Sequence, residues 1–134
     1  MSRILLDTSG YSAFMRGDEA VKGTLQTAEA IYLTPIVLGE LRAGFLRGRT
    51  KEKNEERLGR FLASSRVSVA AVDDETAERY AVILDGLWTA GTPIPTNDIW
   101  IAASAMQYGL MVVTTDAHYL KIPQILVSHT QPAR

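Results

Sequence analysis

The fold is decided by the segment Ile4-Leu5-Leu6-Asp7, in which three large apolar residues are followed at once by an acid. An uninterrupted apolar run predicts a strand buried on both faces, as in a parallel sheet. The run Leu110-Met111-Val112-Val113 has the same character, and two threonines separate it from Asp116. Open α/β sheets bind ligands outside the carboxyl ends of their strands, so Asp7 and Asp116 should meet there if their strands are neighbours.

Longer helical segments separate the apolar strands along the whole chain. Further strands are expected at 30–33, 67–72 and 125–128, and helices at 8–15, 18–28, 34–47, 51–63, 73–89 and 97–109. The segment Thr92-Pro93-Ile94-Pro95 should be extended, because each proline disfavours helix in the residue before it. This order predicts an α/β protein with a three-layer sandwich around a parallel sheet of about five strands, in a single domain over residues 1–134.

The composition narrows the class of protein. The 134 residues include no cysteine and two histidines, which excludes a disulfide scaffold and a thiolate–zinc site and fits a cytoplasmic location. The N-terminal apolar run ends at Asp7, and no stretch approaches the ~18 apolar residues of a membrane span. Neither a signal peptide nor contact with a membrane is expected.

Two further acids lie in apolar helical segments. Asp98 opens a helix that is apolar almost all round, and Glu40 lies on or beside the apolar stripe of its own helix. Each acid has an ordinary alternative role. Asp98 would cap its helix, Glu40 would be a solvated surface acid, and Asp7 and Asp116 would be turn residues.

Four such acids in one crevice would repel one another unless a cation lay between them. Carboxylate oxygens favour Mg²⁺ or Mn²⁺ over zinc. One or two such ions are expected: a metal-bound water would attack a phosphodiester in line, and a second ion would stabilise the leaving oxygen. The products would carry a 3′-hydroxyl and a 5′-phosphate. A mechanism through the ribose 2′-hydroxyl would require a histidine pair, whereas His118 and His129 lie on different segments. His118 is expected in a turn near the site.

The segment 42–60 is basic although the net charge of the chain is −1. It holds seven basic residues against three acidic ones. A basic surface beside an acidic metal site suits a nucleic-acid backbone. The candidate contacts to such a backbone are Arg42, Arg47, Arg49, Lys51 and Lys53. The alternative is a solvated helix pair with salt bridges along its surface.

Four segments together resemble the sequence motifs of one family. They are Ile4-Leu5-Leu6-Asp7-Thr8-Ser9, Pro35-Ile36-Val37-Leu38-Gly39-Glu40-Leu41, Gly91-Thr92-Pro93-Ile94-Pro95-Thr96-Asn97-Asp98-Ile99-Trp100-Ile101-Ala102-Ala103 and Val113-Thr114-Thr115-Asp116-Ala117-His118-Tyr119. In these segments the chain resembles PIN-domain ribonucleases of the VapC type, which are the toxins of toxin–antitoxin pairs. The last motif departs from the family at Thr115, where a basic residue is common, and at Tyr119, where Phe is common.

The resemblance implies particular roles and partners. By it, Asp7, Glu40, Asp98 and Asp116 are the metal-binding and catalytic acids, with Thr8, Asn97 and Thr114 as supporting groups. It further implies an RNA substrate such as tRNA or rRNA, a cognate VapB-type antitoxin lying in the groove, and a homodimer. Residues near the end of the long helix, Leu84, Leu87 and Trp88, are candidates for contacts with the antitoxin or for the core.

Two other functions remain as alternatives. A phospho-acceptor signalling domain also uses acids at strand ends, but it should carry an acidic pair after its first strand and a lysine at the end of a late strand. A non-catalytic nucleic-acid-binding module would use the basic segment while the acids were structural. A nucleotide site of the Walker type is not expected, because no Gly-rich run precedes a Lys-Ser/Thr pair.

Overall fold

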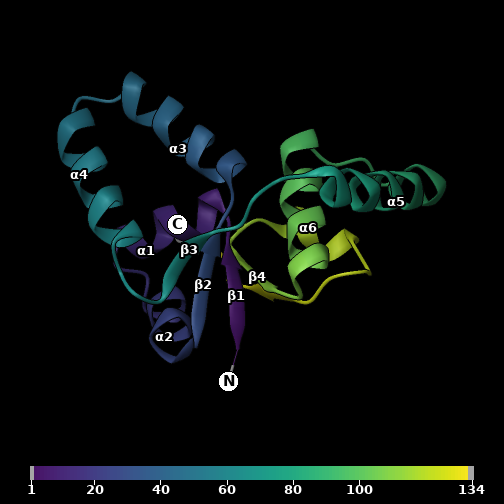
Figure 1. Ribbon diagram of the computed structural model, residues 1–134, viewed down its shortest axis with the longest axis horizontal. Helices are drawn as coiled ribbons and strands as arrows, with labels where there is room; N and C mark the ends of the chain where they lie inside the picture. Colours follow the sequence, from purple (N-terminus) through teal and green to yellow (C-terminus); the bar gives the residue numbers. More distant parts are fainter. Residues whose placement is uncertain (1, 133–134) are drawn as a thin grey trace.

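A parallel sheet lies between two helical layers in the computed structural model, which describes residues 2–132 (Figure 1). The strands are β1 (Arg3–Leu6), β2 (Ala30–Leu33), β3 (Val67–Val69), β4 (Met111–Thr114) and β5 (Val127–His129). Their order in the sheet is β3-β2-β1-β4-β5, and every neighbouring pair is parallel. The predicted α/β sandwich with about five parallel strands is confirmed.

The central strand β1 is the most buried part of the sheet. Ile4, Leu5 and Leu6 each have 0% exposed surface, as the unbroken apolar run predicts. Leu6 lies opposite Val113 of β4, and the backbone N–H of Asp7 donates to the carbonyl of Val113 at 3.3 Å. The strands that carry Asp7 and Asp116 are therefore neighbours, and their carboxyl ends lie side by side.

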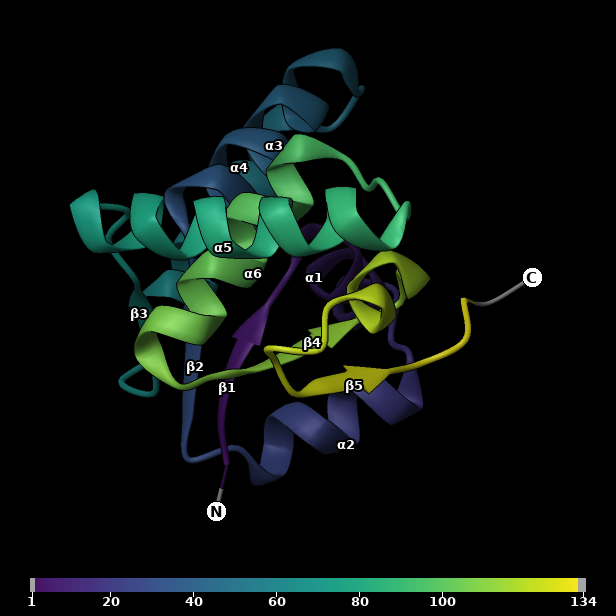
Figure 2. The same ribbon diagram turned by 90° about the vertical axis from the view of Figure 1, so that its right-hand side faces the viewer.

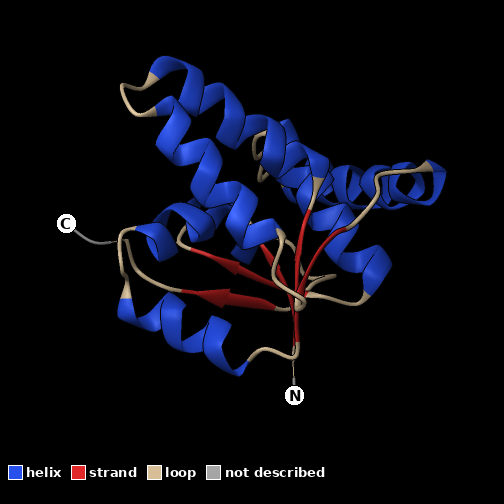
Figure 3. Ribbon diagram, turned by 60° about the vertical axis from the view of Figure 1, so that its left-hand side comes forward, coloured by secondary structure: helices blue, strands red, loops and turns tan. Residues whose placement is uncertain are grey.

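The helices cover both faces of this sheet. They are α1 (Thr8–Met15), α2 (Glu19–Thr27), α3 (Pro35–Arg47), α4 (Lys51–Leu62), α5 (Asp74–Ala90) and α6 (Thr96–Tyr108), with a short 3-10 helix η1 (Ala117–Lys121). In Figure 1 α1, α2 and α4 lie on one side of the sheet and α5 and α6 on the other. Figure 2 shows α5 lying across α6, and Figure 3 shows α3 and α4 as a helical hairpin that extends away from the strands.

The helices that position the site begin where local chemistry favours it. The Asp7 side chain accepts from the backbone N–H of Gly10 and so caps α1 directly after β1. Thr34 caps α3 through the backbone N–H of Val37, with Pro35 at the first helical position. These two starts place the first turns of α1 and α3 at the carboxyl edge of the sheet.

Four details of the secondary structure differ from the sequence-based expectation. β3 ends at Val69 rather than at residue 72, and β5 is shifted to Val127–His129. The helix α6 starts at Thr96 directly after Pro95 and has no side-chain cap, because the proline side chain carries no oxygen to accept from the first backbone N–H groups of the helix. The turn expected after Asp116 is the 3-10 helix η1, which Asp116 caps through the backbone N–H of His118.

Residues 2–132 include no helix with both the length and the apolar character that crossing a bilayer requires.

Candidate functional site

Asp7 is buried at the junction of β1 and α1, with only 3% of its surface exposed. Its Oδ1 accepts from the backbone N–H of Gly10 at 2.7 Å, and its Oδ2 accepts from the hydroxyl of Thr114 at 2.7 Å. The hydroxyl of Ser9 lies 2.9 Å from both carboxylate oxygens. Burial raises the pKa of Asp7 to about 6 against the lowering effect of these hydrogen bonds, and the charge of Asp98 adds to the rise.

Thr114 connects the ends of β1 and β4. Its hydroxyl donates to Asp7 and accepts from the backbone N–H of Asp116 at 2.8 Å. Thr114 has 0% exposed surface, so both contacts are shielded from solvent. The predicted supporting position of Thr114 is therefore matched by its place between the two strand-end acids.

Glu40 reaches the same edge from the first half of α3. Its Oε1 accepts from the hydroxyl of Thr8 at 2.6 Å, and its Oε2 accepts from the side-chain amide of Asn97 at 3.3 Å. Thr8 follows Asp7 in the chain, and Asn97 precedes Asp98. The two supporting residues expected from the sequence thus hold Glu40 between the two aspartates.

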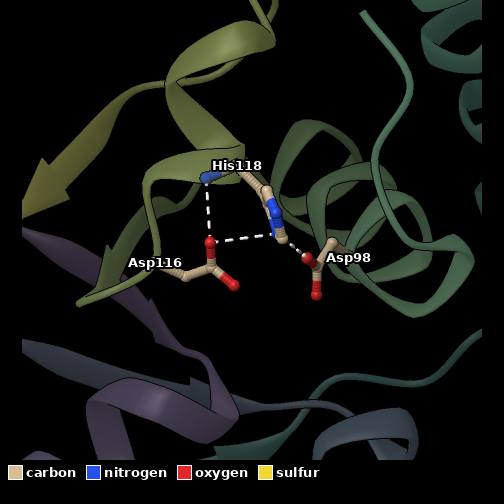
Figure 4. Close-up of side chains that lie close together, drawn as sticks. All are labelled: Asp98, Asp116 and His118. Carbon is tan, nitrogen blue, oxygen red and sulfur yellow. Dashed lines mark hydrogen bonds and ion pairs between the residues drawn. The ribbon is translucent and has the colours of Figure 1, made fainter.

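Asp98 and Asp116 approach each other through a histidine. Figure 4 shows the ring of His118 between the two carboxylates, with Asp98 projecting from α6 and Asp116 from the segment after β4. The Nδ1 atom of His118 lies 2.9 Å from Asp98 Oδ2 and 3.0 Å from Asp116 Oδ1. The backbone N–H of His118 also donates to Asp116 Oδ1 at 2.9 Å. One residue therefore holds both acids.

Tyr119 lies beneath Asp98 and has 0% exposed surface. Its hydroxyl donates to Asp98 Oδ1 at 3.3 Å. Burial raises the pKa of Asp98, and the charge of Asp116 adds to the rise, while the hydrogen bond from His118 opposes it. Burial also raises the pKa of the Tyr119 phenol, and the nearby aspartates contribute, so this hydroxyl stays a hydrogen-bond donor.

These contacts join all four acids in one closed chain of neighbours. Two links are peptide bonds, between Asp7 and Thr8 and between Asn97 and Asp98. At a third link the backbone N–H of Asp116 donates to the hydroxyl of Thr114. The remaining links in this chain of neighbours are contacts between side chains. Its order is Asp7, Thr8, Glu40, Asn97, Asp98, His118, Asp116, Thr114 and back to Asp7. Residues from four separate segments thus converge at the carboxyl edge of the sheet.

The donor set of this site fits a divalent cation. Asp98, Asp116 and His118 each offer one ligand atom, and these three atoms lie within 4.8 Å of one another. Asp7 and Glu40 add carboxylates from the opposite side of the chain of contacts. Burial is the main cause of the raised pKa values of Asp7 and Asp98, and the charge of a neighbouring aspartate adds to each rise. A cation bound beside these carboxylates would favour their charged forms.

The basic residues expected to contact RNA lie mostly away from the acids. Arg42 lies two residues after Glu40 and pairs with Glu55 at 3.5 Å between nitrogen and oxygen. The others lie at the far end of the α3–α4 hairpin, namely Arg47, Arg49, Lys51 and Lys53. They are all exposed and form a basic tip rather than a rim around the acids. We call these four residues the hairpin tip.

Sequence reasoning missed three contributors to the site. Ser9 contacts Asp7 and also accepts from the backbone N–H of Thr115 at 3.0 Å. The sequence predicts only a turn around His118 and Tyr119, whereas the 3-10 helix turns both side chains back onto Asp98. In the sequence, these contacts are indicated only by the positions of His118 and Tyr119, two and three residues after Asp116. Of the candidate contact residues on α5, Leu87 is core at 3% exposed, whereas Trp88 is 69% exposed.

The fold and the sequence also match known proteins. The profile of the PIN domain matches residues 4–125, which is most of the chain. The chain belongs to the PIN-domain family. Within this PIN domain the matched region contains Asp7, Glu40, Asp98 and Asp116.

Similar proteins include Ribonuclease VapC4 of Mycobacterium tuberculosis, at 33% identity over 69% of this chain and 71% of that protein. Ribonuclease VapC of Rickettsia bellii is 31% identical over 92% of this chain and 93% of that protein. The crystal structure of VapBC-5 from M. tuberculosis, a member of the VapBC family of toxin–antitoxin systems, superposes with a TM-score of 0.74 at 27% identity. That match covers 97% of this chain and 100% of the other. The resemblance to the VapC type is therefore confirmed.

Proposed function

We propose that this PIN domain is a metal-dependent endoribonuclease that acts as the toxin of a toxin–antitoxin pair. The observation that carries the proposal is the closed chain of contacts that brings Asp7, Glu40, Asp98 and Asp116 together. The names of the two VapC relatives support RNA as the substrate. The VapBC-5 complex supports inhibition by an antitoxin.

The four acids would hold Mg²⁺ or Mn²⁺ at the carboxyl edge of the sheet. A bound cation of this kind activates water and stabilises the charge that develops on the phosphate. Thr8 and Asn97 keep both oxygens of Glu40 in place, and Thr114 and Ser9 do the same for Asp7. Because these hydrogen bonds fix the carboxylates before the substrate arrives, little reorganisation accompanies the reaction.

RNA would approach this edge along the α3–α4 hairpin. Arg42 and the hairpin tip would contact phosphates, which positions a nucleic acid without reading its bases. The target would be a structured RNA such as tRNA or rRNA. The products would carry a 3′-hydroxyl and a 5′-phosphate, because the attacking group is water rather than the ribose 2′-hydroxyl.

The protein would work in the cytoplasm as a homodimer, with a VapB-type antitoxin covering the acids until it is removed. A basic side chain of the antitoxin would neutralise the four carboxylates in place of the cation. Trp88 is one exposed apolar side chain available for such a contact.

Incubation of the purified protein with total RNA tests the proposal. We expect cutting with Mg²⁺ or Mn²⁺, none with excess EDTA, and 5′-phosphate ends that accept a ligation adaptor. Addition of the co-expressed antitoxin should stop the reaction. Binding of RNA without cutting under all metal conditions would instead indicate a nucleic-acid-binding module.

A further inference from the structure

One ring nitrogen of His118 contacts two acids at once. The Nδ1 atom lies 2.9 Å from Asp98 Oδ2 and 3.0 Å from Asp116 Oδ1. An imidazole nitrogen carries at most one hydrogen, so it cannot donate a full hydrogen bond to both oxygens. An atom placed equally close to two carboxylates is, however, well placed to share a cation with them.

The spacing of these atoms fits neighbouring ligands of one metal ion. Ligand atoms about 2.1 Å from a small divalent cation are roughly 3.0 Å apart when they occupy adjacent octahedral positions. The two distances from Nδ1 match this spacing, and the three ligand atoms lie within 4.8 Å of one another.

The backbone keeps the imidazole in this orientation. The N–H of His118 donates to Asp116 Oδ1, so the acid that would bind the cation also fixes the residue that carries the ring. The side chain of His118 is 40% exposed, and Nδ1 is the ring nitrogen that points at the acids. Figure 4 shows the ring lying between the two carboxylates.

We propose that His118 Nδ1 is a ligand of the divalent cation held by Asp98 and Asp116, which makes this a mixed nitrogen–oxygen site that prefers Mn²⁺ to Mg²⁺. The inference rests on the proposed function for the presence of a cation. Imidazole suits transition metals, whereas Mg²⁺ is bound by oxygen. Loss of the ring should therefore weaken Mn²⁺ binding much more than Mg²⁺ binding.

Pulsed EPR of the Mn²⁺-loaded protein tests the ligand directly, because a coordinated imidazole modulates the electron spin echo through its ¹⁴N nucleus. The chain has two histidines, so two variants assign the signal. We expect the imidazole modulation in the wild type and in His129→Gln, and its loss in His118→Asn. We also expect the Kd for Mn²⁺ to rise at least ~10-fold in His118→Asn, as for loss of a group that supports a metal, with a change below about threefold for Mg²⁺.

Three outcomes would overturn the assignment of His118. They are Mn²⁺ bound to the wild type without ¹⁴N modulation, modulation that persists in His118→Asn, and equal weakening of Mn²⁺ and Mg²⁺. RNA cutting by the same samples separates this result from the proposed function. If the wild type cuts RNA with bound Mn²⁺ but lacks the modulation, only the histidine assignment fails. If it neither binds Mn²⁺ nor cuts RNA, both proposals fail.

Discussion

The hydroxyl of Thr114 lies 2.7 Å from Asp7 Oδ2, so the last residue of β4 holds the acid that follows β1. The same hydroxyl accepts from the backbone N–H of Asp116. One buried side chain therefore fixes the spacing of two acids that are 109 residues apart in the chain.

Replacement of Thr114 by Val should separate these acids without changing the shape of the core. The backbone N–H of Asp116 would be left without its acceptor, which costs about 1–3 kcal/mol in the free energy of unfolding. We expect the rate of RNA cutting to fall roughly 10-fold, in line with the effect of groups that orient metal ligands. Thr114→Ser keeps the hydroxyl and should retain most of the rate. Equal loss in both variants would show that the methyl group, and not the hydroxyl, matters.

The raised pKa of Asp7 predicts how stability depends on pH in the absence of metal. Its pKa is about 6 in the folded protein against an ordinary value of 3.8 for an aspartate, so the folded state binds the proton more tightly. Stability from this group is therefore fully present below about pH 4 and is lost as the pH rises to about 6. The loss is roughly 2–3 kcal/mol.

Urea denaturation in EDTA at pH 4.5 and pH 7 measures this effect. Asp7→Asn should remove most of the difference between the two pH values and should be more stable than the wild type at pH 7. Added Mn²⁺ should stabilise the wild type at pH 7 and leave Asp7→Asn nearly unchanged. The predicted direction would be contradicted if the free energy of unfolding rose more between pH 4.5 and pH 7 in the wild type than in Asp7→Asn.

Gly10 packs α1 against the end of β4. A Cβ at this position would meet the carbonyl oxygen of Val113 at 2.5 Å and Asp7 Oδ1 at 3.0 Å. Gly10→Ala should therefore displace the first turn of α1 and reduce cutting of RNA. The free energy of unfolding should fall by about 1–3 kcal/mol, as in other overpacked cores.

Gly23 provides the control. It lies in α2, and a Cβ added there would have no atom within 4 Å, so Gly23→Ala should stabilise the protein by about 0.5–1 kcal/mol. Thermal melts of the two variants check this contrast.

The hairpin tip should bind RNA through its charge alone. Lys51→Gln with Lys53→Gln should weaken binding of a catalytically inactive variant at 100 mM salt. It should also reduce the slope of log K against log salt by about 0.7 for each phosphate that the variant no longer neutralises. Lys22→Gln changes an exposed lysine on α2, at the other end of the molecule, and should leave the slope unchanged (Figure 1). An unchanged slope in the double variant would mean that RNA binds elsewhere.

The sequence predicts the strands and the positions of the acids well because both follow from local chemistry. The run Ile4-Leu5-Leu6 can only be buried, and the acid after it must then lie at the strand end. Thr34 and Pro35 mark the start of α3 through capping and a fixed φ, which sets where Glu40 lies. These features need no knowledge of the rest of the chain.

The remaining parts of the site depend on contacts between distant segments. The hydroxyl of Ser9 meets Thr115 only because β1 and β4 pair in one register. His118 reaches Asp98 because the chain tightens into a 3-10 helix where an ordinary turn is equally compatible with the residues. The hairpin tip lies far from the acids because α3 continues for two turns beyond Glu40. The pattern of charges in the sequence does not show how far these basic residues lie from the acids.

The proposal that four carboxylates hold divalent metal at one site is tested most directly by single-turnover RNA cleavage. Rates are measured for the wild type, Asp7→Asn and Asp98→Asn at saturating Mn²⁺, with circular dichroism to confirm that each variant is folded. We predict a loss of at least ~10²-fold in both variants, since each removes a carboxylate that would hold the cation that stabilises the charge developing on the phosphate. Cleavage by folded Asp98→Asn at the rate of the wild type would contradict the assignment of this site.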